Sequence, residues 1–310
     1  MSAMAADLSV VILSWNTVEL LRKCLLALRA DQPAARSREV IVVDNGSTDP
    51  SPAMVATEFP EVRLIRNRDN LGYAEGNNVG ARAATGRYLC LLNSDTEVRP
   101  GALDRLVDFL DLHPEYAAVG PRLLNPDGSV QRACMRFPGL LVALVFDLPW
   151  ARVRPFRWVD DWYYMRDFDH LHSRDVEQPP GAVFLMRREE YLARGGLDPE
   201  LFLYFNDVDL CRRLRQLGRR IRYLAEAEVV HHGGASTRRF DKMVVMWHRN
   251  RLAYYRRHYG VVGAWLVRQV VRLRARIEAG KAAQRHPQDP AACAAEREFI
   301  ARSLREILGQ

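Results

Sequence analysis

The stretch LSVVILSWNT, residues 8–17, is the part of the sequence that decides the fold. Leu8–Ser14 is a run of β-branched and apolar residues without regular polar alternation, as expected for a strand buried on both faces. The run ends at Trp15, and either Asn16 or Thr17 can cap a helix that follows at once. A buried strand leading directly into a helix is typical of the opening of an α/β fold.

The same unit recurs along the first 125 residues. Further buried strands are predicted at 39–43, 62–66 and 88–92, with a helix at about 74–84 before the last of them. Strands that alternate with helices in this way predict an α/β fold with a mostly parallel central sheet and helices on both faces.

The composition is that of an ordinary globular protein with a basic charge balance. Apolar residues make up 48% of the chain and the formal net charge is +7, which indicates an anionic partner. The sequence shows no basic leader and no run of about 18 apolar residues, so we expect a soluble or peripheral protein of the cytoplasm. The scattered cysteines predict reduced thiols: Cys24, Cys90, Cys134, Cys211 and Cys293.

The chain changes character twice after the first strand–helix series. Its middle is crowded with aromatic residues and predicts either a loop over a binding cleft or a satellite packed on the core. Beyond it, strands are predicted at 182–187, 221–223 and 228–230. The expected regions are one domain at 1–235, made of a first half at 1–125, a variable aromatic insertion at 126–180 and a second half at 181–235, and then a basic helical C-terminal region at 236–310.

The C-terminal region carries an unusual charge pattern. Eight arginines and no acidic residue lie between Arg249 and Arg276, with Trp265 and aliphatic residues among them. The pattern favours contact with an anionic membrane surface, or else a helix packed on the domain with a solvated basic face. After Ala279 we expect a weakly structured link and a last short helix.

Polar residues follow each of the first four predicted strands. Because parallel strands bring their carboxyl ends to one edge of the sheet, these residues are expected to meet in one crevice. The sequence has no GxGxxG after the first strand and no GxxxxGK loop, so a diphosphate bound there would need a metal ion. Asp95 is the natural oxygen ligand for Mg²⁺ or Mn²⁺. The polar sets are Trp15-Asn16, Asp44-Asn45, Asn67 to Asn78, and Asn93-Ser94-Asp95.

These segments together resemble the family 2 glycosyltransferases, which have the GT-A fold. The likeness covers about residues 8–260 and is greatest to the rhamnosyltransferase-like branch that builds bacterial cell-surface polysaccharides. It implies a Rossmann-like sheet with a helical C-terminal extension. The segments that carry it are LSVVILSWNT, VIVVDNGSTD, NRDNLGYAEGNNVGARAATGRYLCLLNSDTEV, GAVFLMRREEYLARGGLDPELFLYFNDVDLCRRLRQLG and AEVVHHGGAS.

The resemblance implies a nucleotide-sugar site at the first strands. Trp15 stands where the family commonly has Tyr and would stack on the base, with Asn16 beside it. Asp44 would accept a hydrogen bond from the base or ribose. Asn70 and Asn78 would help to shape the pocket.

The resemblance also implies the metal and the catalytic base. Asn93 and Ser94 would meet the donor, with Asn93 contacting the sugar or ribose, while Asp95 and His231 would bind Mg²⁺ or Mn²⁺. Asp207 matches the family's base, and Asp209 is then expected to cap the helix that follows. Asn206 replaces the usual Glu, which removes a like charge that would raise the pKa of Asp207.

The expected activity is an inverting transfer of a sugar, plausibly rhamnose, from a dTDP- or UDP-sugar. The acceptor would be a saccharide or a polyprenyl-linked saccharide at the inner face of the cell membrane. Arg212 and Arg213 would contact phosphate or hold the acidic loop. A catalytically weak GT-A scaffold is one alternative, and a nucleic-acid-binding protein is another. The second leaves the four polar sets unexplained, so we expect no nucleic acid partner.

Overall fold

The chain folds into two compact units. The computed structural model describes residues 6–31, 36–146, 148, 155–233 and 240–309. The sheet unit comprises the described residues of Met1–Phe137, Phe168–Phe202 and Asn206–Arg238, and the helical unit those of Pro138–Asp167, Leu203–Phe205 and Arg239–Gln310. The expected limit between residues 235 and 236 lies outside the described residues.

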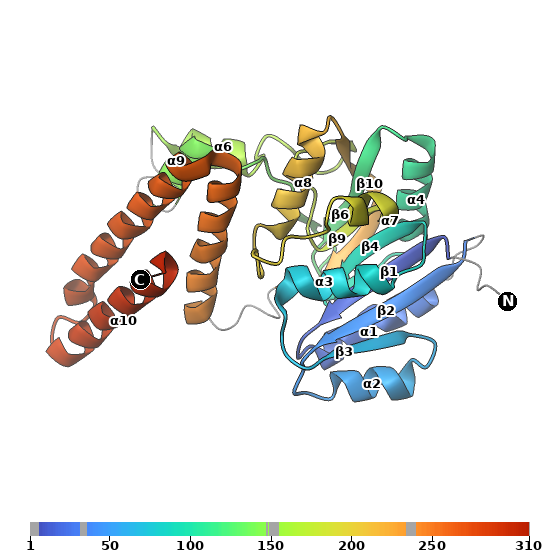
Figure 1. The fold of residues 1–310 in the computed structure, drawn as a ribbon, viewed down its shortest axis with the longest axis horizontal. Coiled ribbons are helices and arrows are strands. Elements are labelled where there is room, and N and C mark those ends of the chain that lie inside the picture. The colour runs from blue at the N-terminus through green and yellow to red at the C-terminus, as the bar shows by residue number, and fades with distance from the viewer. Residues whose placement is uncertain (1–5, 32–35, 147, 149–154, 234–239, 310) are drawn as a thin grey trace. The chain divides into compact units, whose positions relative to one another are not determined.

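One mixed sheet organises the sheet unit (Figure 1). Its strand order is β3-β2-β1-β4-β9-β6-β10-β5. The first four neighbours run parallel, and Leu8 at the start of β1 pairs with Arg38 on one side and Tyr88 on the other. These strands are β1 (Leu8–Ser14), β2 (Arg38–Asn45), β3 (Arg63–Asn67) and β4 (Tyr88–Asn93).

The second half of the sheet reverses direction at β9. This strand lies antiparallel to both β4 and β6, while β10 runs parallel to β6 and antiparallel to β5. The two short strands predicted at 221–223 and 228–230 are one strand with an irregular register between Leu224 and Glu228. The strands are β5 (Thr96–Val98), β6 (Tyr116–Leu124), β7 (Val130–Gln131), β8 (Arg174–Asp175), β9 (Val183–Arg187) and β10 (Arg220–His231).

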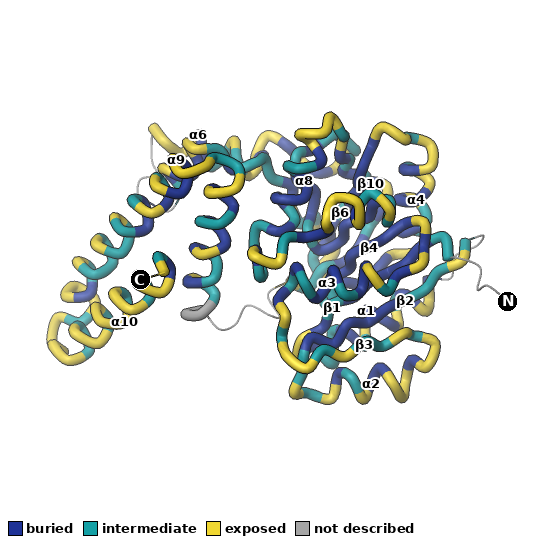
Figure 2. Tube along the Cα trace, in the orientation of Figure 1, coloured by how far each residue is buried: buried dark blue, intermediate teal, exposed yellow. Residues whose placement is uncertain are grey.

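Helices cover both faces of the sheet, as the alternation of side chains along β1 requires. Val10 and Ile12 pack in a core with α1, α2 and α4, whereas Val11 lies against α3. Figure 2 shows the buried residues gathered along the strands between these layers. The helices of this unit are α1 (Val18–Ala30), α2 (Ser51–Glu58), α3 (Gly72–Ala83), α4 (Ala102–Leu112), α7 (Arg188–Ala193) and α8 (Asn206–Gln216).

The helical unit is built around one long, bent helix. α9 (Phe240–Arg285) changes direction at Gly260, whose φ of 62° lies outside the helical region. α5 (Leu140–Val145), α6 (Arg157–Tyr163) and α10 (Pro290–Leu308) complete the unit. Residues 138–167, part of the expected aromatic insertion, therefore group with the C-terminal helices.

The expected weak link after Ala279 is wrong. Helix α9 continues to Arg285, and α10 begins at Pro290, where the Asp289 carboxylate accepts a hydrogen bond from the Ala292 amide at 2.9 Å. All five cysteines are free, as predicted. Within the described residues, no helix is both long and apolar enough to cross a bilayer.

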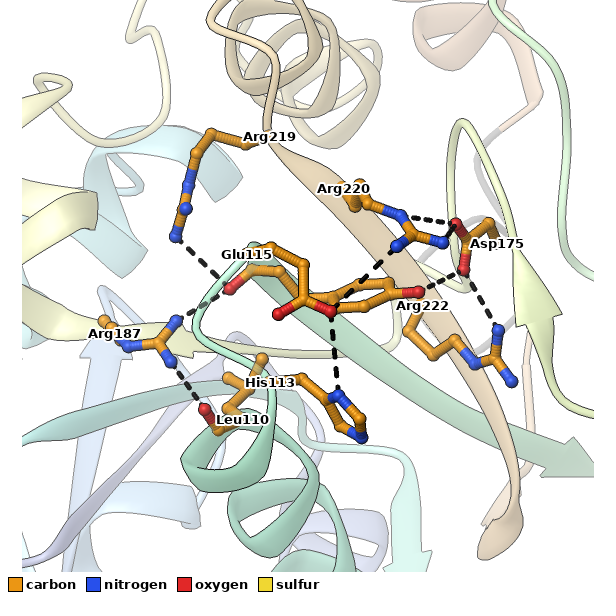
Figure 3. A network of polar contacts seen from close by, with 9 residues as sticks. Leu110, His113, Glu115, Asp175, Arg187, Arg219, Arg220 and Arg222 are labelled. Carbon is orange, nitrogen blue, oxygen red and sulfur yellow. Dashed lines mark hydrogen bonds and ion pairs between the residues drawn. The ribbon is translucent and has the colours of Figure 1, made fainter.

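A polar network closes the amino ends of β6 and β10, opposite the strand ends that carry the predicted site (Figure 3). The Asp175 carboxylate accepts hydrogen bonds from the Tyr116 hydroxyl at 2.8 Å, from Arg220 at 2.6 Å and from Arg222 at 3.0 Å. Arg187 donates to the Tyr116 carbonyl at 2.7 Å. Burial alone would raise the pKa of Asp175, but these hydrogen bonds outweigh burial and hold the pKa below its usual value.

Asp175→Asn is expected to destabilise the sheet unit in a pH-dependent way. A carboxylate with a depressed folded-state pKa contributes stability above its unfolded pKa of about 3.9 and loses it as the pH falls through the folded value. Because the carboxylate is partly exposed, we expect a loss of about 1 kcal/mol at neutral pH. Urea unfolding of both proteins from pH 7 down to pH 3 would measure it. A difference that does not shrink below about pH 4 would contradict this account.

Candidate active site

The carboxyl ends of β1 and β4 are joined by a chain of hydroxyl groups. Thr17 lies 3.0 Å from the Ser14 hydroxyl and donates to Ser94 at 3.0 Å. Thr17 stands at the start of α1, but its side chain does not cap that helix. The Asp49 carboxylate, from the loop after β2, accepts the hydrogen bond of the Val18 amide instead. Ser94, which is predicted to contact the nucleotide-sugar donor, is therefore held at the end of β4 by the hydrogen bond from Thr17, which follows β1.

The Asn16 side chain joins the loop after β1 to the loop after β2. Its amide oxygen accepts hydrogen bonds from the backbone of Thr48 at 2.8 Å and Asp49 at 3.2 Å. The residue adopts a positive φ of 54°, which Asn tolerates better than most residues. Trp15 beside it is 36% exposed, so its ring is accessible to a ligand.

Asp44 carries a buried oxygen atom that the protein leaves without a partner. The residue is 3% exposed, and one carboxylate oxygen lies 3.4 Å from the Ser47 amide. The other oxygen, Oδ1, is buried and has no hydrogen-bond partner. Because a buried, unpaired acceptor is costly, this atom is the strongest candidate in the crevice for a hydrogen bond from a ligand.

Asn45, to which sequence reasoning gave no separate role, organises the loop after β3. Its side-chain nitrogen donates to Asn70 Oδ1 at 2.8 Å, and its oxygen accepts from Asn67 at 3.0 Å and from the Leu71 amide at 3.1 Å. Asn70 Oδ1 also accepts from the Gly72 amide at 2.9 Å. Asn70 thus lies in the loop after β3, and its side-chain oxygen accepts hydrogen bonds that hold this loop in place. The only sequence signal for Asn45 was its position next to Asp44 at the end of a predicted strand.

Asn78 lies inside α3, away from the strand ends. Its nitrogen donates to the Leu197 carbonyl at 2.7 Å, and its oxygen accepts from the Tyr191 hydroxyl at 2.6 Å and the Leu197 amide at 3.0 Å. The residue is 5% exposed. Its amide therefore links α3 to the segment that follows α7, and any influence on a nucleotide pocket acts through that link.

The two predicted metal ligands lie next to each other. His231 Nε2 is 3.4 Å from Asp95 Oδ1, because the antiparallel pairing of β5 and β10 places His231 beside Thr96. His231 Nδ1 lies 2.7 Å from Gln131 Oε1, which orients the ring. His232 instead pairs with Glu97 at 2.6 Å.

This pair fits an open metal site rather than a closed one. Among the residues that the structure describes, no three His, Cys, Asp or Glu side chains are arranged to hold a metal ion. One carboxylate and one imidazole leave coordination positions for water and phosphate oxygens, which suits Mg²⁺ or Mn²⁺.

Asp207 is the second residue of α8 and is tightly packed. Its Oδ1 accepts from the Val208 amide at 2.8 Å and its Oδ2 accepts from Gln178 at 3.0 Å. A Cβ atom at Gly181 would overlap Oδ2, so this approach requires glycine. Burial raises the pKa of Asp207, and the two hydrogen bonds oppose the rise. The absence of a Glu at position 206 therefore does not leave this pKa at its ordinary value.

Gln178 is a residue that sequence reasoning missed. It is 4% exposed, and its backbone is fixed by two hydrogen bonds of 3.2 Å with Met135. One amide hydrogen is donated to Asp207, while Oε1 is buried without a partner. The nearest feature predicted from the sequence was the strand at 182–187, so the sequence held no signal for this contact.

Tyr73 connects the end of β4 to the segment that enters β9. Its hydroxyl lies 3.1 Å from Asn93 Oδ1 and 3.3 Å from the Gly181 carbonyl. Burial is the main cause that raises the pKa of Tyr73, and the negative charges of Asp207 and Asp95 add to it. Asn93, Asp95 and Asp207 are therefore brought into one neighbourhood around this ring.

One expectation about the start of α8 needs correction. Asp209 does not cap the helix: α8 begins at Asn206, whose side-chain oxygen accepts from the Asp207 amide at 2.8 Å. Asp209 is fully buried and pairs with Arg213 at 2.8 Å, one helical turn away. Arg213 also donates to the Gly196 carbonyl at 2.6 Å. Of the two roles left open for this arginine, the structure thus shows the structural one.

Comparison with known proteins places this chain in a family. The model of glycosyl transferase family 2 matches residues 9–177. The N-acetylglucosaminyl-diphospho-decaprenol L-rhamnosyltransferase of Mycobacterium tuberculosis is 32% identical over 227 residues, which are 69% of this chain and 71% of that protein. The O-antigen biosynthesis protein RfbC of Myxococcus xanthus is 32% identical over 70% of this chain and 17% of its own length.

Solved structures share the fold. A mannosyltransferase from Pyrobaculum calidifontis, in complex with GDP-Man and Mn²⁺, has a TM-score of 0.55 at 16% identity, over 99% of this chain and 87% of that one. GalNAc-T7 with UDP, GalNAc and Mn²⁺ has the same TM-score at 15% identity, over 96% of this chain and 55% of that one. The predicted α/β GT-A fold is thereby confirmed, and the chain belongs to glycosyltransferase family 2.

Proposed function

We propose that this glycosyltransferase moves a sugar with inversion from a dTDP- or UDP-sugar, with a bound divalent metal and Asp207 as the catalytic base. The observation that carries the proposal is that Asp95, which lies beside His231, and the buried Asp207 both interact electrostatically with the same residue, Tyr73. Asp95 and His231 would thereby bind the donor through the metal, and Asp207 would accept the proton, at the same transferred sugar.

The nucleotide would bind at the ends of β1 and β2. The accessible ring of Trp15 can stack on the base, and the unpaired Oδ1 of Asp44 can accept a hydrogen bond from base or ribose. Asn16 and Asn70 would act by holding the loops, because their oxygens already accept hydrogen bonds within the protein. Asn93 and Ser94 would line the sugar and diphosphate end.

Asp95 and His231 would hold Mg²⁺ or Mn²⁺. When bound, the ion would neutralise the charge that develops on the departing nucleoside diphosphate. Gln131 keeps the His231 ring in place through Nδ1, which leaves Nε2 on the side of Asp95. The weak protein ligand set is consistent with an ion that binds together with the donor.

Asp207 would remove the proton of the acceptor hydroxyl as that oxygen attacks the anomeric carbon and the bond to the diphosphate breaks. Burial raises the pKa of Asp207 and makes the carboxylate a better proton acceptor. The Gln178 amide and the Val208 amide each fix one of its oxygens. Gln178 is therefore a positioning residue in this scheme.

Rhamnose as the transferred sugar, and a polyprenyl-linked saccharide as the acceptor, are the finer part of the proposal. They are supported by the likeness to the mycobacterial rhamnosyltransferase, whose name specifies a decaprenol-linked acceptor. Such an acceptor would place the enzyme at the cytoplasmic face of an anionic membrane. The formal charge of +7 suits that surface.

Asp207→Asn is expected to lower kcat by about 10²–10⁴, because the carboxylate that takes the proton is lost. Donor affinity should be unchanged, since Asp207 does not bind the nucleotide. Product formation and donor titration would be measured in parallel, with the exposed Asp127→Asn as the matched control. Near wild-type turnover by folded Asp207→Asn would remove Asp207 from the base role and favour another residue.

Gln178→Met is expected to move the acid limb of the kcat–pH profile to higher pH. The hydrogen bond from Gln178 lowers the pKa of Asp207, so its loss raises that pKa and the base becomes deprotonated only at higher pH. Gln178→Glu should move the limb further, because it adds a like charge. Tyr73 on α3 and Cys211 on α8 also interact electrostatically with Asp207 and are unchanged in both variants. An unshifted limb in both would refute the positioning role.

Asp95→Asn and His231→Gln are each expected to weaken the metal-dependent part of donor binding. Each removes one of two protein ligands, so affinity for Mn²⁺ with nucleotide should fall by about tenfold or more. Thermal shifts with dTDP- and UDP-sugars, with Mn²⁺, Mg²⁺ or chelator, would measure this. Asp44→Asn should weaken nucleotide binding with metal and with chelator alike. If a sugar nucleotide stabilises the wild-type protein equally with metal and with chelator, the result would argue against a metal.

A further inference from the structure

The bend of α9 exposes a group of apolar side chains to solvent. Gly260 separates two straight halves of the helix, and Val261 and Val262 follow it directly (Figure 1). Val261 is 82% exposed and Val262 is 63% exposed, and Trp265 one turn later is 56% exposed. Hydrophobic side chains with this degree of exposure gain little from packing on the fold.

The beginning of α5 lies at the same bend. The Tyr259 hydroxyl donates to the Pro138 carbonyl, and the Tyr255 hydroxyl donates to the Gly139 carbonyl, both at 3.0 Å. Arg251 donates to the Ala143 carbonyl at 2.7 Å, so α5 runs back from the bend along the first half of α9. These contacts hold the start of α5 within the helical unit.

Helix α5 adds its own exposed apolar residues at this end of the unit. Leu140, Leu141 and Leu144 are 36%, 43% and 40% exposed. We call the six side chains the apolar corner: Leu140, Leu141, Leu144, Val261, Val262 and Trp265. Exposed large apolar residues are ordinary when scattered, but a group of them at one end of a unit marks an interaction site.

The charges around the apolar corner identify the partner. Arg256 and Arg257 are exposed just before the bend, and Arg268 is exposed just after it. No acidic residue occurs between Arg249 and Arg276. Arginines beside apolar and tryptophan side chains are the pattern of a helix that lies in the interface of an anionic bilayer. A second copy docking corner to corner would bring arginines against arginines, which is repulsive.

We propose that the apolar corner inserts into the headgroup region of an anionic lipid bilayer, with Arg256, Arg257 and Arg268 contacting lipid phosphates. The bound partner is the bilayer surface itself, whatever saccharide the enzyme uses. The proposal rests on the membrane placement given under the proposed function and names the surface responsible for it, and vesicle binding tests it without donor, metal or acceptor.

The experiment is flotation of the full chain with phosphatidylcholine vesicles that contain or lack phosphatidylglycerol. Wild-type protein is expected to float with the anionic vesicles and to be released as salt rises. Val261→Ser combined with Val262→Ser should weaken binding by about tenfold or more. Arg256→Gln with Arg257→Gln and Arg268→Gln should weaken it and remove the salt dependence. Leu112→Ser is the matched control, because Leu112 is 77% exposed on α4 of the sheet unit.

Further measurements separate insertion from misfolding and from self-association. Anionic vesicles should shift the tryptophan emission of wild-type protein to shorter wavelength, and Trp265→Phe should reduce that shift. The serine variants should keep the wild-type unfolding temperature and turnover of a short-chain, water-soluble acceptor.

Three outcomes would overturn the proposal. One is equal flotation of wild type and a folded serine variant, and another is equal binding to neutral and anionic vesicles. The third is a wild-type dimer in light scattering that the serine substitutions dissociate, because the corner would then be a contact between copies. Asp207→Asn is expected to lose turnover and to float as the wild type does, so failure of the proposed function can be told from failure of the membrane proposal.

Discussion

The insertion of β9 between β4 and β6 is the constraint on which the rest of the sheet unit depends. Its antiparallel pairing with both neighbours joins the first, parallel half of the sheet to the half that contains β10. The segment that enters β9 is held beside the end of β4, because the Asn93 amide donates to the Ala182 carbonyl at 2.9 Å. Gln178 and Gly181 are thereby carried to the crevice, where both meet Asp207.

Electrostatics in the crevice follow from this packing. A carboxylate in a buried position resists ionisation unless hydrogen bonds stabilise its charge, and Asp207 has two such bonds against a pKa rise caused by burial. Asp95 is treated differently, because a histidine lies beside it. Two carboxylates thus have separate environments in one site, which suits separate roles in metal binding and proton removal.

The helical unit depends on packing between helices and not on a sheet. Its core is formed where α5, α6 and α9 pack on one another, with Val142, Val145 and Val159 buried together. The same short helix α5 also exposes leucines beside the bend of α9. A helix that buries one face and exposes a second apolar face leaves that second face available for an interaction partner.

The fold class could be predicted from the sequence because strand–helix alternation is a local signal. The runs at β1 and β4 carry their own burial pattern, and the helix after β1 follows from spacing alone. Among the elements that the sequence did not predict are β5 and β6, because a short edge strand such as β5 has little sequence pattern and β6 is defined by the strands that pair with it. The single strand β10 was predicted as two pieces, because its irregular middle interrupts the periodicity.

For the site, the sequence by itself determined which residue types stand at the strand ends, because parallel strands must bring those ends together. Motif resemblance selected Asp95, His231 and Asp207 from distant parts of the chain. Only the tertiary structure decided that His231 lies beside Asp95 while His232 pairs with Glu97, and that Asn78 is a structural link. It alone revealed that Gln178 contacts Asp207 and that Tyr73 contacts Asn93. The physical reason is that strand ends are set by local pattern, whereas side-chain partners depend on contacts between segments far apart in the chain.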